Sequence, residues 1–216
     1  MSTYNITYNT LILLGALLSL VAWKNGHKRY LVLCILLVLT AAVELSAQYM
    51  LKRRIDFTAL YHAFVLVEYP FFAGFLLGAI KPGKFANAIK ISIPLYIVIS
   101  LSISLFYYHF KGFPGLNINL EGLLESILCT YILFNLEVTE GRSILKNQYF
   151  WICSGILTFF GTTFFFNSVY TYVLHMDGSK ARELFVIING PLNLILYAFI
   201  IIGILCLLTS RRFITQ

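Results

Sequence analysis

The stretch YLVLCILLVLTAAVELSAQYM, residues Tyr30–Met50, decides the fold class of this chain. It contains a single charged side chain, Glu44, in an otherwise apolar or weakly polar run. A helix needs about 20 mostly apolar residues to cross a hydrocarbon core about 30 Å thick. The sequence therefore predicts a membrane-spanning helix at this position.

Similar runs occur along the whole chain of 216 residues, of which 59% are hydrophobic and 12% charged. A soluble domain is nearer one half apolar and one quarter charged, so lipid is the natural solvent for most of this chain. The runs predict seven spans: Tyr8–Trp23, Tyr30–Met50, Phe57–Ile80, Ala88–His109, Ile118–Glu137, Tyr149–Leu174 and Leu184–Leu208. The predicted fold is an all-α polytopic transmembrane bundle that forms one domain over residues 1–216.

The basic residues lie in short clusters between the apolar runs, as in the loops that flank membrane spans. Seven spans with the N-terminus outside and the C-terminus inside place ten of the sixteen Lys and Arg on the inner side. The positive-inside rule favours this orientation, and we expect an integral protein of the bacterial inner membrane. Membrane lipids are the expected partners of these cations, and nucleic acid is not.

Ionisable side chains within a span are costly at mid-bilayer, so they normally face the interior of a bundle and have a function there. Counting depth at 1.5 Å per residue with the N-terminus outside places most of the polar span residues in the outer half, and Glu68 near the centre. These residues predict an acid-rich pocket that opens outward above a layer of Leu, Ile and Phe. The predicted ligand-binding residues are Glu44, Gln48, Tyr61, His62, Glu68, Glu121, Glu125, Asn167, Asn189 and Asn193.

Each of these residues also has a structural explanation. Glu121 suits the first turn of a helix because of the helix dipole. Glu44 or Glu125 could be a protonated carboxyl that makes one interhelical hydrogen bond. His62 could be a packing residue. Asn189 and Asn193, which form a stripe on one face of their helix, could join helices. Glu68 is hardest to explain in this way, because it is central and no span carries Lys or Arg near its middle.

Four buried acids cannot all be ionised at once, so the cluster suits protons, a metal cation or a ligand that carries an amine. The usual marks of a metal site are absent, since there is no HExxH motif and only His62 is well placed. We therefore predict no metal site and no cofactor, and we assign no catalytic residue. The four cysteines lie inside apolar runs without a pairing pattern and are expected to be packing residues.

Several seven-helix families are excluded by residues that they need. Microbial rhodopsins need a lysine in the last span, and Leu184–Leu208 contains none. Adiponectin-receptor-like hydrolases need three histidines around zinc, and rhomboid proteases need a serine motif with a histidine on another span. This sequence has neither arrangement. The EExxxR signature of CAAX-type proteases is absent as well.

The stretches LYHAFVLVEYP (Leu60–Pro70) and YFWICSG (Tyr149–Gly155) resemble segments of small uncharacterised bacterial seven-helix membrane proteins. The resemblance implies a seven-helix bundle and carries no activity or catalytic residue. We expect a receptor- or sensor-like protein that binds a small ligand and acts through a membrane partner. Two alternatives stay open: an intramembrane enzyme on lipid or a small ester that uses Glu/His acid–base or metal chemistry, and a proton- or cation-coupled transporter. The sequence leaves the ligand and the oligomeric state open.

Overall fold

The computed structural model of the chain describes residues 3–136, 143–176 and 178–210, and all regular structure in these ranges is helical. The seven α-helices are α1 (Thr3–Lys24), α2 (Tyr30–Lys52), α3 (Thr58–Leu76), α4 (Lys84–Ser102), α5 (Gly115–Phe134), α6 (Gln148–Met176) and α7 (Gly178–Ser210). Three short segments join them: the 3₁₀ turns η1 (Leu77–Ala79) and η3 (Ile144–Lys146), and the π-helical η2 (Ile103–Tyr107). Seven helices are long and apolar enough to cross a membrane, which confirms the predicted fold class. The orientation of the termini remains a prediction.

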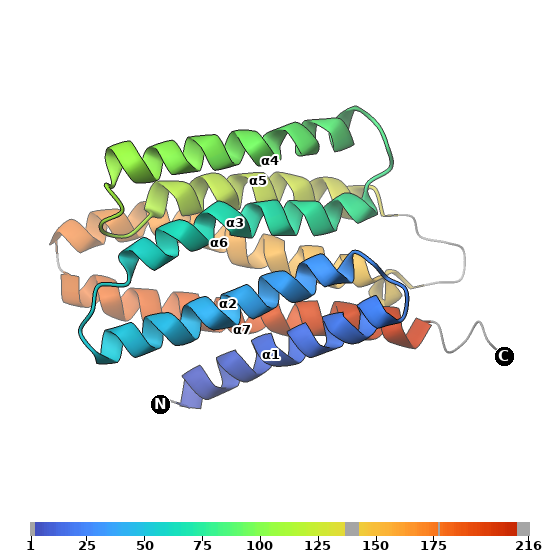
Figure 1. The fold of residues 1–216 in the computed structure, drawn as a ribbon, viewed down its shortest axis with the longest axis horizontal. Coiled ribbons are helices and arrows are strands. Elements are labelled where there is room, and N and C mark those ends of the chain that lie inside the picture. The colour runs from blue at the N-terminus through green and yellow to red at the C-terminus, as the bar shows by residue number, and fades with distance from the viewer. Residues whose placement is uncertain (1–2, 137–142, 177, 211–216) are drawn as a thin grey trace.

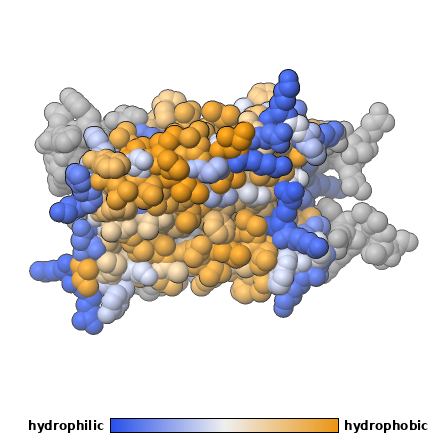
Figure 2. All heavy atoms as spheres, turned by 45° about the horizontal axis from the view of Figure 1, so that its top comes forward, coloured by the Kyte–Doolittle hydropathy of each residue, from blue (hydrophilic) through white to orange (hydrophobic). Residues whose placement is uncertain are grey.

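The helices run alternately in opposite directions, so the bundle has two ends (Figure 1). We call the end where α1 begins the N-terminal end, and the other the opposite end. Large apolar side chains such as Leu17, Val98 and Phe134 are exposed around the bundle. Figure 2 shows a hydrophobic band between two hydrophilic rims, as expected for a surface that faces lipid between two water layers.

Six helices pack in the closed order α1–α2–α3–α5–α6–α7, with α7 returning to α1. Helix α4 lies outside this ring and packs on α3, as its place at the edge of Figure 1 indicates. The α-helical part of α4 is shorter than the predicted span, because the chain continues as η2 and then leaves the helix. His109 and Phe110 have φ of 50° and 57°, in the left-handed region that ends a right-handed helix.

Helix α3 begins after a short turn at the N-terminal end. The backbone N–H of Thr58 donates to Asp56 Oδ1 at 2.9 Å. This hydrogen bond lowers the pKa of the exposed Asp56 carboxyl below its ordinary value. The turn thus satisfies one of the backbone donors that a helix start leaves free.

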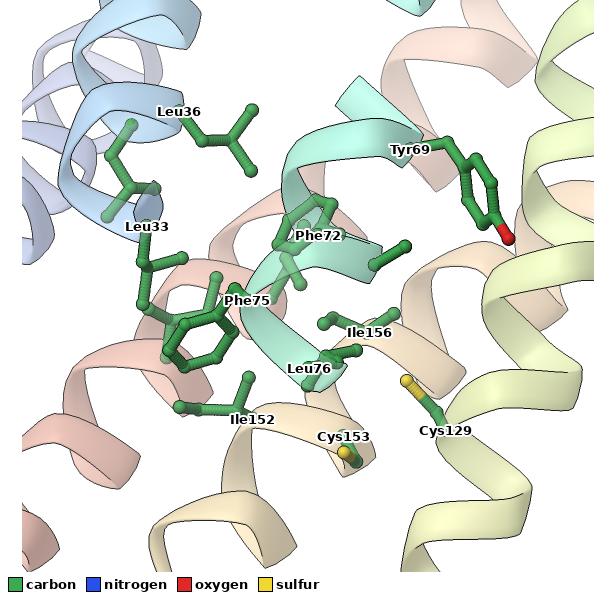
Figure 3. Packing of buried hydrophobic residues seen from close by; sticks show 14 of the residues in the cluster. Leu33, Leu36, Tyr69, Phe72, Phe75, Leu76, Cys129, Ile152, Cys153 and Ile156 are labelled. Atoms are coloured by element: carbon green, nitrogen blue, oxygen red, sulfur yellow. The ribbon is translucent and has the colours of Figure 1, made fainter. Parts of the chain in front are cut away.

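The half of the bundle nearer the opposite end is filled by an apolar layer. Phe72 and Phe75 of α3 point between Leu33 and Leu36 of α2 and Ile152 and Ile156 of α6 (Figure 3). All six side chains are fully or almost fully buried. The structure therefore contains the layer of Leu, Ile and Phe that the sequence predicts beneath the polar residues. Cys129 and Cys153 are buried in the same core as free thiols, in agreement with the predicted packing role.

Gly74 and Gly78 form a GxxxG motif that usually lets a second helix approach closely. No helix among the described residues packs closely against it. A Cβ at Gly74 would meet no atom within 4 Å, and one at Gly78 would meet the side chain of Arg29. The close helix contact lies elsewhere, at Gly155 and Gly203 between α6 and α7.

Candidate functional site

Four carboxyl groups from three helices form the centre of the candidate site. Glu44 lies on α2, Glu68 on α3, and Glu121 and Glu125 lie one turn apart on α5. Helix α3 packs between α2 and α5, so Glu68 lies on the helix that joins the two others and is the central member of the group. We call these four residues the acidic cluster.

The acidic cluster belongs to the half of the bundle nearer the N-terminal end and to its middle. The same holds for the fully buried His62, Ser104 and Asn117. The sequence predicts this concentration at one end, and the helix bounds agree with it. Whether that end faces outward depends on the topology, which stays a prediction.

The members of the acidic cluster differ in exposure and in hydrogen bonding. Glu44 is partly exposed, and its Oε1 accepts a hydrogen bond from the Tyr61 hydroxyl at 3.5 Å. Glu68 is also partly exposed. Glu121 and Glu125 are 0% exposed, and none of their carboxyl oxygens accepts a hydrogen bond from a described residue. Buried polar groups are almost always paired, so these two acids are the unusual members of the cluster.

A second layer of tyrosines surrounds the carboxyl groups. Tyr8 and Tyr197 pack edge to face at 5.5 Å, and both interact electrostatically with Glu44. Tyr96 interacts with Glu68, Glu121 and Glu125, and its hydroxyl donates to the Val65 carbonyl oxygen at 2.8 Å. The three tyrosines are buried and come from α1, α4 and α7.

His62 lies in a separate polar group at the N-terminal end. Its Nδ1 is 3.0 Å from Ser104 Oγ, and Asn117 Nδ2 donates to the same Oγ at 2.7 Å. The rings of Tyr108 and Phe110 lie beside the imidazole at 5.2 and 5.7 Å. Ser104 belongs to the π-helical η2, a kind of segment that is frequent at functional sites. His62 is thus bound to Ser104 of η2 and through it linked to Asn117 of α5, which agrees with the packing alternative for this residue.

Ser104→Ala should lower the free energy of unfolding by about 1–3 kcal/mol, because it leaves His62 and Asn117 without their shared buried partner. Ser102→Ala is the matched control. Its hydroxyl bonds only to the Val98 carbonyl oxygen of its own helix, toward the surface, and its loss should cost about 0.5 kcal/mol or less. Thermal unfolding in detergent measures both, and equal effects would contradict the shared role of Ser104.

The other predicted residues are not joined to the acidic cluster by a described contact. Gln48 is half-buried one turn beyond Glu44, and Asn167 is buried on α6. Asn193 Nδ2 donates to the Asn189 carbonyl oxygen at 2.8 Å, beside Pro191. The asparagine stripe therefore makes a bond within its own helix.

The described residues contain no group of three His, Cys, Asp or Glu close enough to hold a metal ion. Two hollows in the described part of the chain lie away from the acidic cluster. One of about 380 Å³ is lined by Phe85 and Tyr131 between α4 and α5, and one of about 200 Å³ lies beside Arg29. Neither hollow is lined by a residue of the acidic cluster, so the predicted pocket stays a prediction.

Tyr8, Tyr96, Ser104 and Asn117 are absent from the sequence-based prediction. Tyrosine near a span end is ordinarily an interfacial anchor, so its sequence signal is ambiguous. Asn117 stands four residues before Glu121, and this spacing on one helix face is a signal that could have found it. Comparison of the chain with models of protein families, with curated proteins and with solved structures gives no match.

Proposed function

We propose that this protein is a receptor-like protein of the bacterial inner membrane that binds a small, positively charged ligand at the acidic cluster. The observation that carries the proposal is the pair Glu121 and Glu125, both fully buried and without a hydrogen-bond donor among the described residues. Buried carboxyl groups are costly unless they are paired, and natural proteins keep such groups where they have a function.

The counter-charge does not come from the two helices that carry Glu68, Glu121 and Glu125. No Lys or Arg occurs in α5 or in α3, and His62 is engaged with Ser104. A proton or a cation is therefore the missing partner of the carboxyl groups. The neighbouring rings of Tyr8, Tyr96 and Tyr197 favour an organic ammonium group, because aromatic faces attract such cations.

A binding function fits better than transport or catalysis. The layer between the acidic cluster and the opposite end consists mainly of apolar side chains, and it contains no buried carboxyl group among the described residues, which favours binding over passage of an ion across the membrane. Glu44 and Glu68 are partly exposed, so a ligand would reach these acids first and the buried pair next. Binding would then change the packing of α3 against α5, which a membrane partner could detect.

The test uses the purified protein in lipid nanodiscs with tetramethylammonium, butylammonium and guanidinium as probes. We expect a cationic probe to raise the melting temperature, and neopentane-type neutral isosteres to leave it unchanged. Glu121→Gln with Glu125→Gln should weaken butylammonium binding about 10²- to 10⁴-fold, because hydrogen bonds to charged groups contribute about 1.5–3 kcal/mol each. Asp56→Asn is the control, since it removes an exposed acid at the same end and keeps an acceptor for Thr58.

Equal effects of charged and neutral probes, or full binding by the double variant, would contradict the proposal. Uptake of a labelled probe into proteoliposomes would instead favour the transporter. Hydrolysis of a lipid or ester that is lost in Glu68→Gln would favour the enzyme.

A further inference from the structure

A hollow of about 200 Å³ opens toward the opposite end of the bundle, away from the acidic cluster. Arg29 and Lys90 line it from two sides, and the rest of its lining is apolar or glycine, including Gly74 and Pro82. We propose that this hollow binds the headgroup of an anionic phospholipid, with the start of an acyl chain lying over Gly74. This site is independent of the function proposed for the acidic cluster.

Arg29 is held beside the hollow by the absence of a side chain at Gly78. A Cβ at this position would lie 2.5 Å from Arg29 Cδ, 3.0 Å from Nε and 3.1 Å from Nη1. The arginine side chain therefore lies directly on η1, and its guanidinium group stays next to the rim. Guanidinium groups bind phosphate oxygens in a bidentate manner, which suits a phosphodiester.

Lys90 supplies the second cation from within the membrane. It follows the start of α4 at Lys84 by six residues, which places it about 9 Å along the helix. Its side chain is exposed on the outside of the bundle. A cation at this depth is costly unless it reaches the interface or meets an anion.

The described protein supplies no anion at this end. All five carboxylates with described side chains lie toward the N-terminal end or at the middle of the bundle: Glu44, Asp56, Glu68, Glu121 and Glu125. Basic hollows between spanning helices are a known setting for lipid phosphates, and the headgroup of an anionic lipid would supply an anion to Arg29 and Lys90.

The apolar part of the lining favours a lipid over a free phosphate ion. A Cβ added at Gly74 would meet no atom within 4 Å, so there is open space over this glycine. Gly74, Leu77 and Ile80 line the same hollow as the two cations. A hydrocarbon chain would fill it, whereas an inorganic ion would leave it unused.

The test is native mass spectrometry of the full chain released from detergent with equal amounts of phosphatidylglycerol and phosphatidylcholine. We expect the wild type to retain one phosphatidylglycerol in preference to phosphatidylcholine. Arg29→Gln and Lys90→Gln should each weaken this retention about fivefold, and the double variant about 25-fold. Lys24→Gln with Lys84→Gln is the matched control, because it removes two exposed cations at the same end that do not line the hollow.

Gly74→Leu tests the apolar half of the site without a change of charge. The open space accepts the new side chain, so the melting temperature should stay within a few degrees of the wild type while lipid retention falls. Retention of phosphatidylglycerol by both Gly74→Leu and the double Gln variant would overturn the proposal. Equal retention of the two lipids by the wild type would do so too, as would full displacement of the lipid by millimolar inorganic phosphate.

Discussion

Gly203→Ala is expected to destabilise the folded protein by about 1–3 kcal/mol, although alanine is normally the better helix residue. A Cβ at Gly203 would lie 2.6 Å from Ile152 Cγ1 and 2.8 Å from the backbone oxygen of Gln148. The backbone oxygen cannot rotate away, so α6 and α7 must move apart. Thermal unfolding in detergent should show a melting temperature lower by about 2–4 °C for each kcal/mol lost.

Gly74→Ala is the matched control for this effect. Both glycines lie inside apolar helices, but the site of a Cβ at Gly74 is open. The change should therefore leave stability unaltered or raise it by up to about 1 kcal/mol through helix propensity. Effects of the same sign and size at the two positions would show that the α6–α7 contact is not the close one that the structure places at Gly203.

The helices themselves could be predicted from the sequence because each depends on a local property, a run of about 20 mostly apolar residues. The span predicted at Tyr30–Met50 is helix α2, Tyr30–Lys52, with the same first residue. Errors occur where the ends depend on more than hydropathy. The first helix begins at Thr3, whereas the predicted span begins at Tyr8. The polar residues Asn5 and Thr7 interrupt the apolar run, but the backbone helix continues through them at the membrane edge.

The location of the polar residues along the bundle was also predictable, since depth follows from residue count at a fixed rise. Which of these polar residues contact one another across helices was not predictable. Spacing relates Glu121 to Glu125 on one helix, but contacts between helices depend on how each helix is rotated and which helices are neighbours. α3 packs on both α4 and α5, so its acid Glu68 meets α5 while its His62 meets Ser104 of η2.

The GxxxG motif illustrates the same limit. Gly74 and Gly78 have the spacing of a helix-contact site, and Gly155 and Gly203 belong to no motif of that kind in the sequence. The close contact nevertheless lies at the second pair. A small residue permits close approach, but the partner helix has to be next to that face, and the sequence of one helix does not specify this.

Glu125→Met is expected to raise the free energy of unfolding of the unliganded protein by about 1–3 kcal/mol, the usual cost of a buried polar group without a partner. The carboxyl group of Glu125 is fully buried and accepts no hydrogen bond from a described residue. Methionine has an unbranched chain that can follow the path of the glutamate and fill the same space. The melting temperature in detergent should therefore rise, while the stabilisation by cationic probes is lost.

Glu44→Met is the comparison that makes this result interpretable. Glu44 accepts a hydrogen bond from Tyr61 and interacts with Tyr8, so its removal leaves the Tyr61 hydroxyl without its acceptor and should destabilise the protein. Opposite signs for the two variants would mean that Glu125 is kept at a cost in stability, as expected of a residue retained for binding. A loss of stability in Glu125→Met comparable to that in Glu44→Met would instead make Glu125 a structural carboxyl. The acidic cluster would then lose the observation on which its proposed function depends.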